Sequence, residues 1–133
     1  LEHALDKRVW LKSGGYLVIE PTEALTVIDV NTGKFDGRNA DREKTFLKTN
    51  LEACAEIARQ LILRNISGII IIDFINLCEK DNRNIIQDTM KKYLAADPVK
   101  AVFVEFTGLD LMEVTRKKIK KPLHEILKGE RNA

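Results

Sequence analysis

Apolar and polar positions along this chain predict strands near the N-terminus, followed by helices that alternate with further strands. Two β-rich runs, residues 8–12 and 16–20, are separated by a Ser-Gly-Gly turn, and a Gly-Gly pair supplies the positive φ that a tight turn requires. A third run, residues 24–30, follows a Pro-Thr turn. The pattern therefore predicts three consecutive antiparallel strands.

Residues 69–74 contain four consecutive β-branched apolar residues, which predict a strand buried on both faces. Before it, residues 31–48 are rich in Gly, Asp, Asn, Lys and Arg and predict a long loop. Thr49 and Glu52 then have the spacing of a capping box, and apolar residues at three- and four-residue steps predict a helix that ends near Gly68. A helix that leads into a buried strand implies that part of the sheet is parallel.

A second helix is predicted over residues 81–96, with Asp81 as N-cap, and its apolar residues are expected to face inward: Ile86, Met90, Tyr93 and Leu94. A strand over residues 99–106 follows, and Pro122 and Gly129 bracket a short final helix over residues 123–128. The fold class predicted is α/β (α+β), a mixed β-sheet with N-terminal antiparallel strands and helices packed on it.

Two of the predicted strands carry an acidic residue next to their last position, Asp29 in the third strand and Asp73 in the strand 69–74. If these strands lie side by side, both carboxylates meet at one sheet edge, with Asn31 on the same face as Asp29. Two aspartates and an amide are hard oxygen ligands suited to Mg²⁺ and to phosphoryl chemistry. The alternative is that Asp29 and Asn31 only shape a turn and that Asp73 caps the next one.

Composition indicates one domain that folds around an ordinary core. The chain has 133 residues, 44% of them hydrophobic, and its 22 basic and 20 acidic residues give a net charge of only +2. No apolar run is long enough to span a bilayer, and the two cysteines lack metal-site spacing, which fits a reducing cytoplasm. A start without methionine, on a polar stretch, suggests a piece of a longer protein.

A basic run at residues 116–121 is the second candidate for function. Five of its six residues are Lys or Arg, beginning with Arg116, Lys117 and Lys118, and Lys100 adds a further charge. Such a run either neutralises phosphates of a bound partner or forms a solvated face. Elsewhere, Cys54 is expected in the core, and Trp10 and Tyr16 are expected to pack as a cross-strand pair.

Several long motifs, taken in order, resemble the catalytic core of the bacterial ribonuclease E/G family. They are RVWLKSGGYLVIEPTEALTVIDVNTG at 8–33, TNLEA at 49–53, EIARQL at 56–61, GIIIIDFI at 68–75 and MEVTRKK at 112–118. The resemblance implies that residues 1–133 are a single deoxyribonuclease-I-like catalytic subdomain. The family's S1 domain, most of its 5′ sensor and its zinc-binding link would then lie outside this chain.

The resemblance also implies an endoribonuclease that cleaves single-stranded RNA with Mg²⁺, leaves 5′-phosphate products and is a homo-oligomer in the full-length enzyme. Asp29 and Asp73 match the family's metal-binding aspartates, and Asn31 matches the Asn that assists beside them. Lys100 falls where the family places a basic residue near the pocket that senses an RNA 5′ monophosphate. An isolated subdomain without the RNA-binding parts is expected to be weakly active or inactive.

Two positions depart from the family pattern. Asn76 stands where a second Asp is usual, and Asp110 stands where a Gly is usual, which places a side chain at an expected positive-φ position. Two other functions remain open: a non-catalytic RNA-binding module that uses the basic run 116–121, and an assembly domain.

Overall fold

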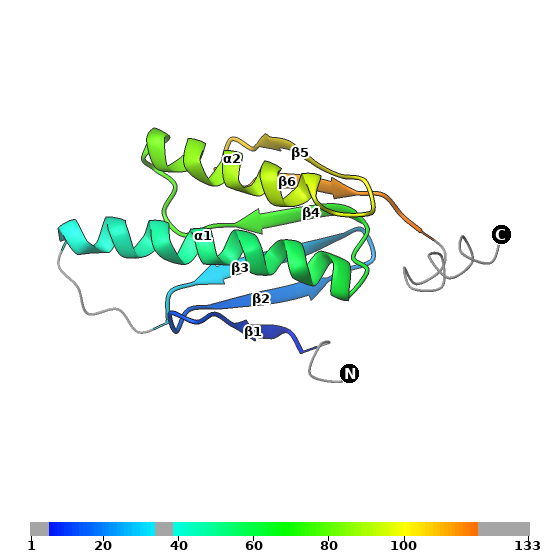
Figure 1. The fold of residues 1–133 in the computed structure, drawn as a ribbon, viewed down its shortest axis with the longest axis horizontal. Helices are drawn as coiled ribbons and strands as arrows, with labels where there is room; N and C mark the ends of the chain where they lie inside the picture. Colours follow the sequence, from blue (N-terminus) through cyan, green and yellow to red (C-terminus); the bar gives the residue numbers. More distant parts are fainter. Residues whose placement is uncertain (1–5, 34–38, 120–133) are drawn as a thin grey trace.

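Six strands form one mixed sheet in the order β1-β2-β3-β4-β6-β5, and two helices lie against the same side of it (Figure 1). The computed structural model describes residues 6–33 and 39–119. This arrangement confirms the predicted fold class. The elements are β1 (Arg8–Trp10), β2 (Tyr16–Pro21), β3 (Leu25–Asn31), α1 (Asn39–Leu63), β4 (Gly68–Asp73), α2 (Lys80–Ala95), β5 (Ala101–Phe106) and β6 (Met112–Arg116).

Strand pairing agrees with the sequence pattern at the N-terminus. β1, β2 and β3 are consecutive antiparallel strands, and Gly14 supplies the turn between the first two with φ of 97°. The crossover through α1 makes β4 parallel to β3, as predicted. β6, which the sequence pattern did not predict, pairs antiparallel with β4 and carries β5 at the sheet edge.

Helix α1 begins much earlier than the sequence pattern predicts. The pattern misses the start because the first turns of the helix are polar and resemble a loop. It starts at Asn39, so most of the predicted loop over residues 31–48 is helical, and that prediction is wrong. Thr49 lies inside the helix with only 2% of its surface exposed, so it is not an N-cap. α2 agrees with its prediction to within a residue, although Asp81 lies in its first turn and the N-cap is Glu79.

The hydrophobic core lies between the helices and one face of the sheet. Alternate strand residues point into it, including Ile28 and Ile72, which have no exposed surface. The helices contribute residues such as Ile57 and Met90, and Cys54 is buried there as predicted. Tyr93, predicted to face inward, is 40% exposed instead.

The opposite face of the sheet has no covering layer within the described residues, and we call it the open face. β4 was predicted to be buried on both sides, but Ile69 is 42% exposed there. Val27, Val102 and Val104 are also exposed on this face. Functional side chains on this side of β3 and β4 are therefore accessible in the chain as it stands.

Two further predictions concern a membrane span and the C-terminal residues. In the described part of the chain, neither helix combines the length and the apolar content needed to cross a membrane. The predicted final helix over 123–128 and the last residues of the basic run, 120 and 121, lie outside the described residues.

Candidate active site

Asp29 and Asp73 lie directly beside each other on the open face. The parallel register pairs Asp29 of β3 with Asp73 of β4, so their Cα atoms are separated by one strand spacing, about 4.8 Å. Because the preceding residues Ile28 and Ile72 point into the core, both aspartates project to the other side. Asp29 is half-buried and Asp73 is exposed. The expected convergence of two carboxylates therefore occurs at a place that solvent reaches.

Asn31 orients one of these carboxylates. Its Nδ2 donates a hydrogen bond to Oδ2 of Asp29 at 3.4 Å, which is possible because residues two apart on a strand share a face. Asn31 also pairs with Tyr16 on the neighbouring strand β2. The amide thus lies between the aspartates and the N-terminal hairpin.

The electrostatics of the pair favour a cation. Although the Asp73 side chain reaches solvent, the loss of part of its hydration on the sheet, followed by repulsion from the Asp29 carboxylate, raises the pKa of Asp73 above its ordinary value. A divalent cation held by these two carboxylates would offset this repulsion. Within residues 6–33 and 39–119, no group of three or more His, Cys, Asp or Glu side chains is arranged as a metal site. Two carboxylates nevertheless suit Mg²⁺, which retains several waters and needs only one or two protein ligands.

Helix α1 fixes the chain immediately beyond Asp73 through one buried side chain. Asn50, 2% exposed, donates from Nδ2 to the carbonyl oxygen of Ile75 at 2.8 Å and accepts from the N–H of Ile75 at 3.0 Å. Both backbone groups of Ile75 are therefore satisfied by a single amide. This double hydrogen bond determines where the chain runs after β4 ends.

Close backbone packing fixes the chain beyond Asn31 in a similar way. A Cβ on Gly15 would lie 2.6 Å from the carbonyl oxygen of Asn31, and a Cβ on Gly33 would lie 2.5 Å from that of Gly14. Gly33 also has φ of 73°. The Gly-Gly turn and the end of β3 can approach this closely only because both sides lack side chains.

The predicted phosphate-binding lysines lie at the other end of the sheet. Gly68, at the start of β4, pairs with Arg116, and β4 then runs five residues to Asp73, a distance of about 16 Å. Lys100, Lys117 and Lys118 are exposed near this far end, where the N–H of Lys117 donates to the carbonyl oxygen of Lys100 at 2.8 Å. The structure therefore brings these lysines near one another but separates them from the carboxylates.

Arg116 differs from the lysines because it is buried. Its side chain donates to both carboxylate oxygens of Asp97, at 2.8 and 3.1 Å, and also to Oδ1 of Asn65 and the carbonyl oxygen of Ile66. The side chains of the ion pair are 0% and 3% exposed. This guanidinium joins β6 to the loops after α1 and α2 and is enclosed by its partners, so it is not available to contact RNA phosphates.

The two departures from the family motifs fall on unusual backbone conformations. Asp110 has φ of 60°, as its Gly-like position predicted, and Asn76 has φ of 42°. Asn and Asp tolerate this left-handed region better than most residues. Asp110 also forms an ion pair with Arg83, whose guanidinium lies over the ring of Phe106. The Asp110 side chain, which stands where the family has Gly, therefore contacts α2 through Arg83, and Arg83 in turn contacts Phe106 of β5.

Two features of the open face were not assigned to the site from sequence. Glu113 lies on this face because its neighbours Met112 and Val114 point into the core, and the alternation in MEVTR is the signal that indicates it. The predicted pair of Trp10 and Tyr16 is confirmed, with ring centroids 5.2 Å apart. Its position next to Asn31 became evident only from the strand register.

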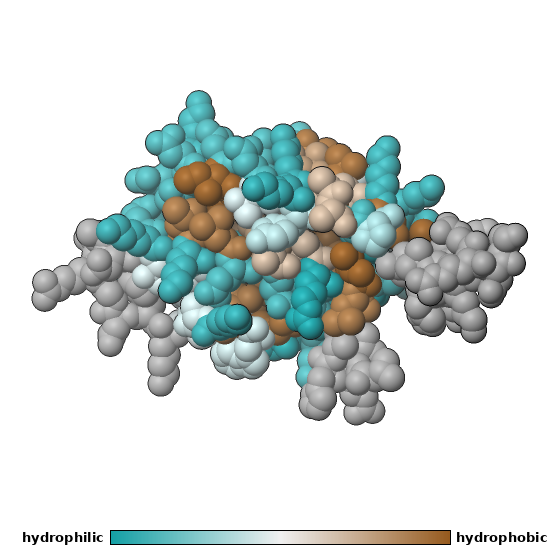
Figure 2. Space-filling model, viewed as in Figure 1, coloured by the Kyte–Doolittle hydropathy of each residue, from teal (hydrophilic) through white to brown (hydrophobic). Residues whose placement is uncertain are grey.

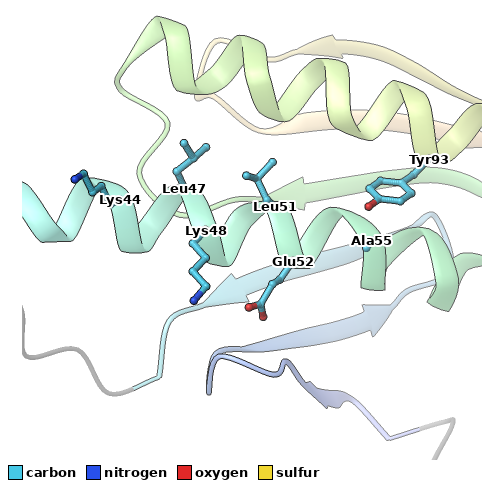
Figure 3. Close-up of a pocket in the computed structure, with 7 residues that line it drawn as sticks. All are labelled: Lys44, Leu47, Lys48, Leu51, Glu52, Ala55 and Tyr93. Atoms are coloured by element: carbon cyan, nitrogen blue, oxygen red, sulfur yellow. The ribbon is translucent and has the colours of Figure 1, made fainter.

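A surface cavity of about 550 Å³ lies elsewhere, on the helices (Figure 3). Leu47 and Leu51 of α1 and Tyr93 of α2 contribute apolar surface to it, and Lys48 and Glu52 lie at its edge. On this helical side, apolar patches are interspersed among hydrophilic residues (Figure 2). The cavity is on the opposite side of the sheet from Asp29 and Asp73, so it is not part of the candidate active site.

Comparison with known proteins gives consistent matches. The Ribonuclease E/G family matches residues 1–119. Ribonuclease G of Escherichia coli is 46% identical over 131 residues, covering 98% of this chain and 26% of the relative. Ribonuclease G of Haemophilus influenzae is 48% identical over 127 residues, with 96% and 26% covered. Ribonuclease E of a Nostoc species is 47% identical over 126 residues, with 95% and 18% covered. The chain thus spans about a quarter or less of these relatives.

Proposed function

Because this chain belongs to the Ribonuclease E/G family, we propose that it is the catalytic subdomain of a larger endoribonuclease that cleaves single-stranded RNA with Mg²⁺. The observation that carries the proposal is the placement of Asp29 and Asp73 in register on adjacent parallel strands, on an accessible face. Its relatives bear the names Ribonuclease G and Ribonuclease E, which supports RNA as the substrate.

Asp29 and Asp73 would hold the ion. When bound, Mg²⁺ supplies an activated water and stabilises negative charge on a phosphate oxygen. Asn31 holds the Asp29 carboxylate in a fixed orientation through its hydrogen bond, so this ligand need not be ordered during the reaction. In-line attack of water on the phosphodiester, with departure of the 3′ oxygen of the upstream strand, leaves a 5′ phosphate on the downstream product.

The test uses the full-length protein and a 5′-monophosphorylated, A/U-rich single-stranded RNA, with Mg²⁺ or with EDTA. Asp29→Asn and Asp73→Asn should each abolish cleavage while leaving the unfolding midpoint close to that of wild type. Asp88→Asn is the matched control, since Asp88 is an exposed aspartate on α2. A double Asp29→Asn, Asp73→Asn variant that retains Mg²⁺-dependent cleavage would refute the assignment.

A non-catalytic RNA-binding role is the second candidate, and the grouping of Lys100, Lys117 and Lys118 at the far end of the sheet favours it. Lysines that contact phosphates make binding weaken steeply with salt. If this role is the correct one, the full-length protein will bind RNA equally with Mg²⁺ and with EDTA and will not cleave it. Replacing the three lysines with Gln should then remove most of the salt dependence.

A further inference from the structure

The N-terminal hairpin presents a compact group of aromatic and cationic side chains on the open face. Trp10 of β1 is 62% exposed, and its ring lies 5.2 Å from that of Tyr16 on β2, with the two planes inclined at 55°. The guanidinium of Arg8 lies 4.4 Å from the Tyr16 ring centroid and 5.5 Å from that of Trp10. These contacts restrain the three side chains in one arrangement.

The strand register places this group beside the carboxylates. One row across the sheet runs from Trp10 to Tyr16 to Asn31, because β1 pairs with β2 and β2 pairs with β3 at these positions. A second row runs from Arg8 through Val18 to Asp29 and then to Asp73. Since neighbouring strands lie about 4.8 Å apart, Trp10 is about 10 Å from Asn31 along its row.

We propose that Trp10, supported by Tyr16 and Arg8, stacks on a nucleobase of the RNA strand whose backbone crosses Asp29 and Asp73. This inference rests on the proposed function. A large indole surface left in water is unfavourable unless a partner covers it, and every nucleobase offers a flat π-face that can do so. Arg8 adds positive charge beside the ring, which complements the phosphate backbone, whereas a cationic or purely apolar partner would not match this surface.

The occupant is assigned to single-stranded RNA because the group continues the same face as the candidate active site. A base paired within a duplex hides its faces, so only an unpaired strand can stack on an exposed ring. The contact is indifferent to base identity, since stacking needs only a π-face. Its role would be to hold the strand near the scissile phosphate, and Trp10 is therefore a positioning residue.

Trp10 provides a direct signal, because it is the only tryptophan among the 133 residues. The chain is titrated with a short single-stranded oligo(A) RNA in EDTA, so that no cleavage occurs, while the indole fluorescence is recorded. Stacking predicts saturable quenching. An oligomer of equal charge that contains only abasic nucleotides should leave the fluorescence unchanged. Equal quenching by both oligomers would mean that only the backbone is bound, and would overturn the proposal.

The affinity of labelled oligo(A), measured by fluorescence anisotropy, tests the energetic contribution. Trp10→Ala should weaken binding by about 5- to 150-fold, the range for losing one stacked base. Trp10→Phe keeps a flat ring and should recover most of that loss. Tyr93→Ala is the matched control, because Tyr93 is an exposed aromatic residue on the helical side of the sheet. Affinity for Trp10→Ala equal to that of wild type would contradict the proposal.

A purely structural role for the aromatic pair is separable from stacking. A cross-strand pair also stabilises its hairpin, so urea titrations first identify conditions in which both wild type and Trp10→Ala are folded, and the two are compared only there. In the full-length protein under those conditions, loss of stacking should raise KM with little change in kcat, and Trp10→Phe should restore KM. If kcat and KM instead stay at wild-type values, the pair serves only the hairpin and the proposal fails.

Failure of this inference is distinguishable from failure of the proposed function. If Asp73→Asn abolishes cleavage but the Trp10 variants bind RNA normally, the endoribonuclease assignment stands and the stacking proposal does not. If Trp10 is quenched by RNA and Trp10→Ala weakens binding while the double aspartate variant still cleaves, the stacking contact stands and the catalytic assignment fails.

Discussion

Asn50 is the side chain through which helix α1 holds the backbone beyond Asp73, and its removal should have a large effect on stability. Asn50→Ala eliminates two hydrogen bonds, at 2.8 and 3.0 Å, and leaves the N–H and the carbonyl of Ile75 without these partners. With Asn50 only 2% exposed, water cannot easily replace the amide. Each orphaned group costs about 1–2 kcal/mol, so we expect a loss of about 2–4 kcal/mol in the free energy of unfolding.

Urea unfolding followed by circular dichroism measures this loss. For an m-value of about 2 kcal/mol/M, the urea midpoint should fall by about 1–2 M. Asn84→Ala is the control, because Asn84 is exposed on α2 and a change there should alter the stability by less than about 0.5 kcal/mol. The reasoning is refuted if Asn50→Ala and Asn84→Ala unfold at the same urea concentration.

The same substitution should also affect cleavage by the full-length protein. With Ile75 released, the end of β4 is no longer fixed, and Asp73 should lose its defined position beside Asp29. In assays without urea, at a temperature at which the variant is fully folded, we therefore expect a lower kcat and a higher Mg²⁺ concentration at half-maximal rate. An unchanged Mg²⁺ dependence would show that Asn50 acts on stability alone.

Two further predictions concern buried groups. Asp97→Asn leaves the charge of Arg116 without its carboxylate partner, in an ion pair whose side chains are 0% and 3% exposed. The free energy of unfolding measured in urea should therefore fall by about 3–5 kcal/mol. A loss below about 1 kcal/mol would contradict the structural role of the ion pair. Burial raises the pKa of Cys54 from 9.0 to about 12, so a disulfide reagent at pH 8 should label only the exposed Cys78 until the chain is unfolded. Rapid labelling of both thiols in the native chain would contradict the burial of Cys54. Since the pKa of this thiol is higher in the folded than in the unfolded chain, its contribution to stability is fully present below pH 9.0 and is lost as the pH rises toward 12.

The sequence predicts those helices and strands whose apolar residues recur at a regular spacing, because that spacing reflects one face packed on the core. The hairpin was predictable because its Gly-Gly turn separates two β-rich runs, and the parallel pairing of β3 and β4 followed from the intervening helix. The start of α1 was not predictable in the same way. Its first turns carry Arg42, Glu43 and Lys44, whose polarity resembles that of a loop, and the helical state is decided by the continuation of the chain into the packed segment.

The sequence predicts which acidic residues belong to the candidate site, but it does not predict the register that places them side by side. Asp29 and Asp73 could be identified because each lies near the end of an apolar strand, but their direct opposition depends on a register that no single strand specifies. The basic neighbours of Arg116 in sequence indicate a shared phosphate-binding role with the lysines, although β6 directs its side chain into the interior toward Asp97. Long-range partners such as this one are invisible to local charge patterns.

If Asp29 and Asp73 act as proposed, the in-register pairing of β3 and β4 makes cleavage depend on correct folding. A slip of β4 by one residue would turn Asp73 toward the apolar layer beneath the helices and bring an isoleucine out in its place. Burying a lone carboxylate there is strongly unfavourable, so misaligned chains are disfavoured energetically and, if formed, would lack one of the two acidic groups. The aspartate thus discriminates against wrong alignments of its own strand, and molecules that have folded incorrectly would be inert toward RNA.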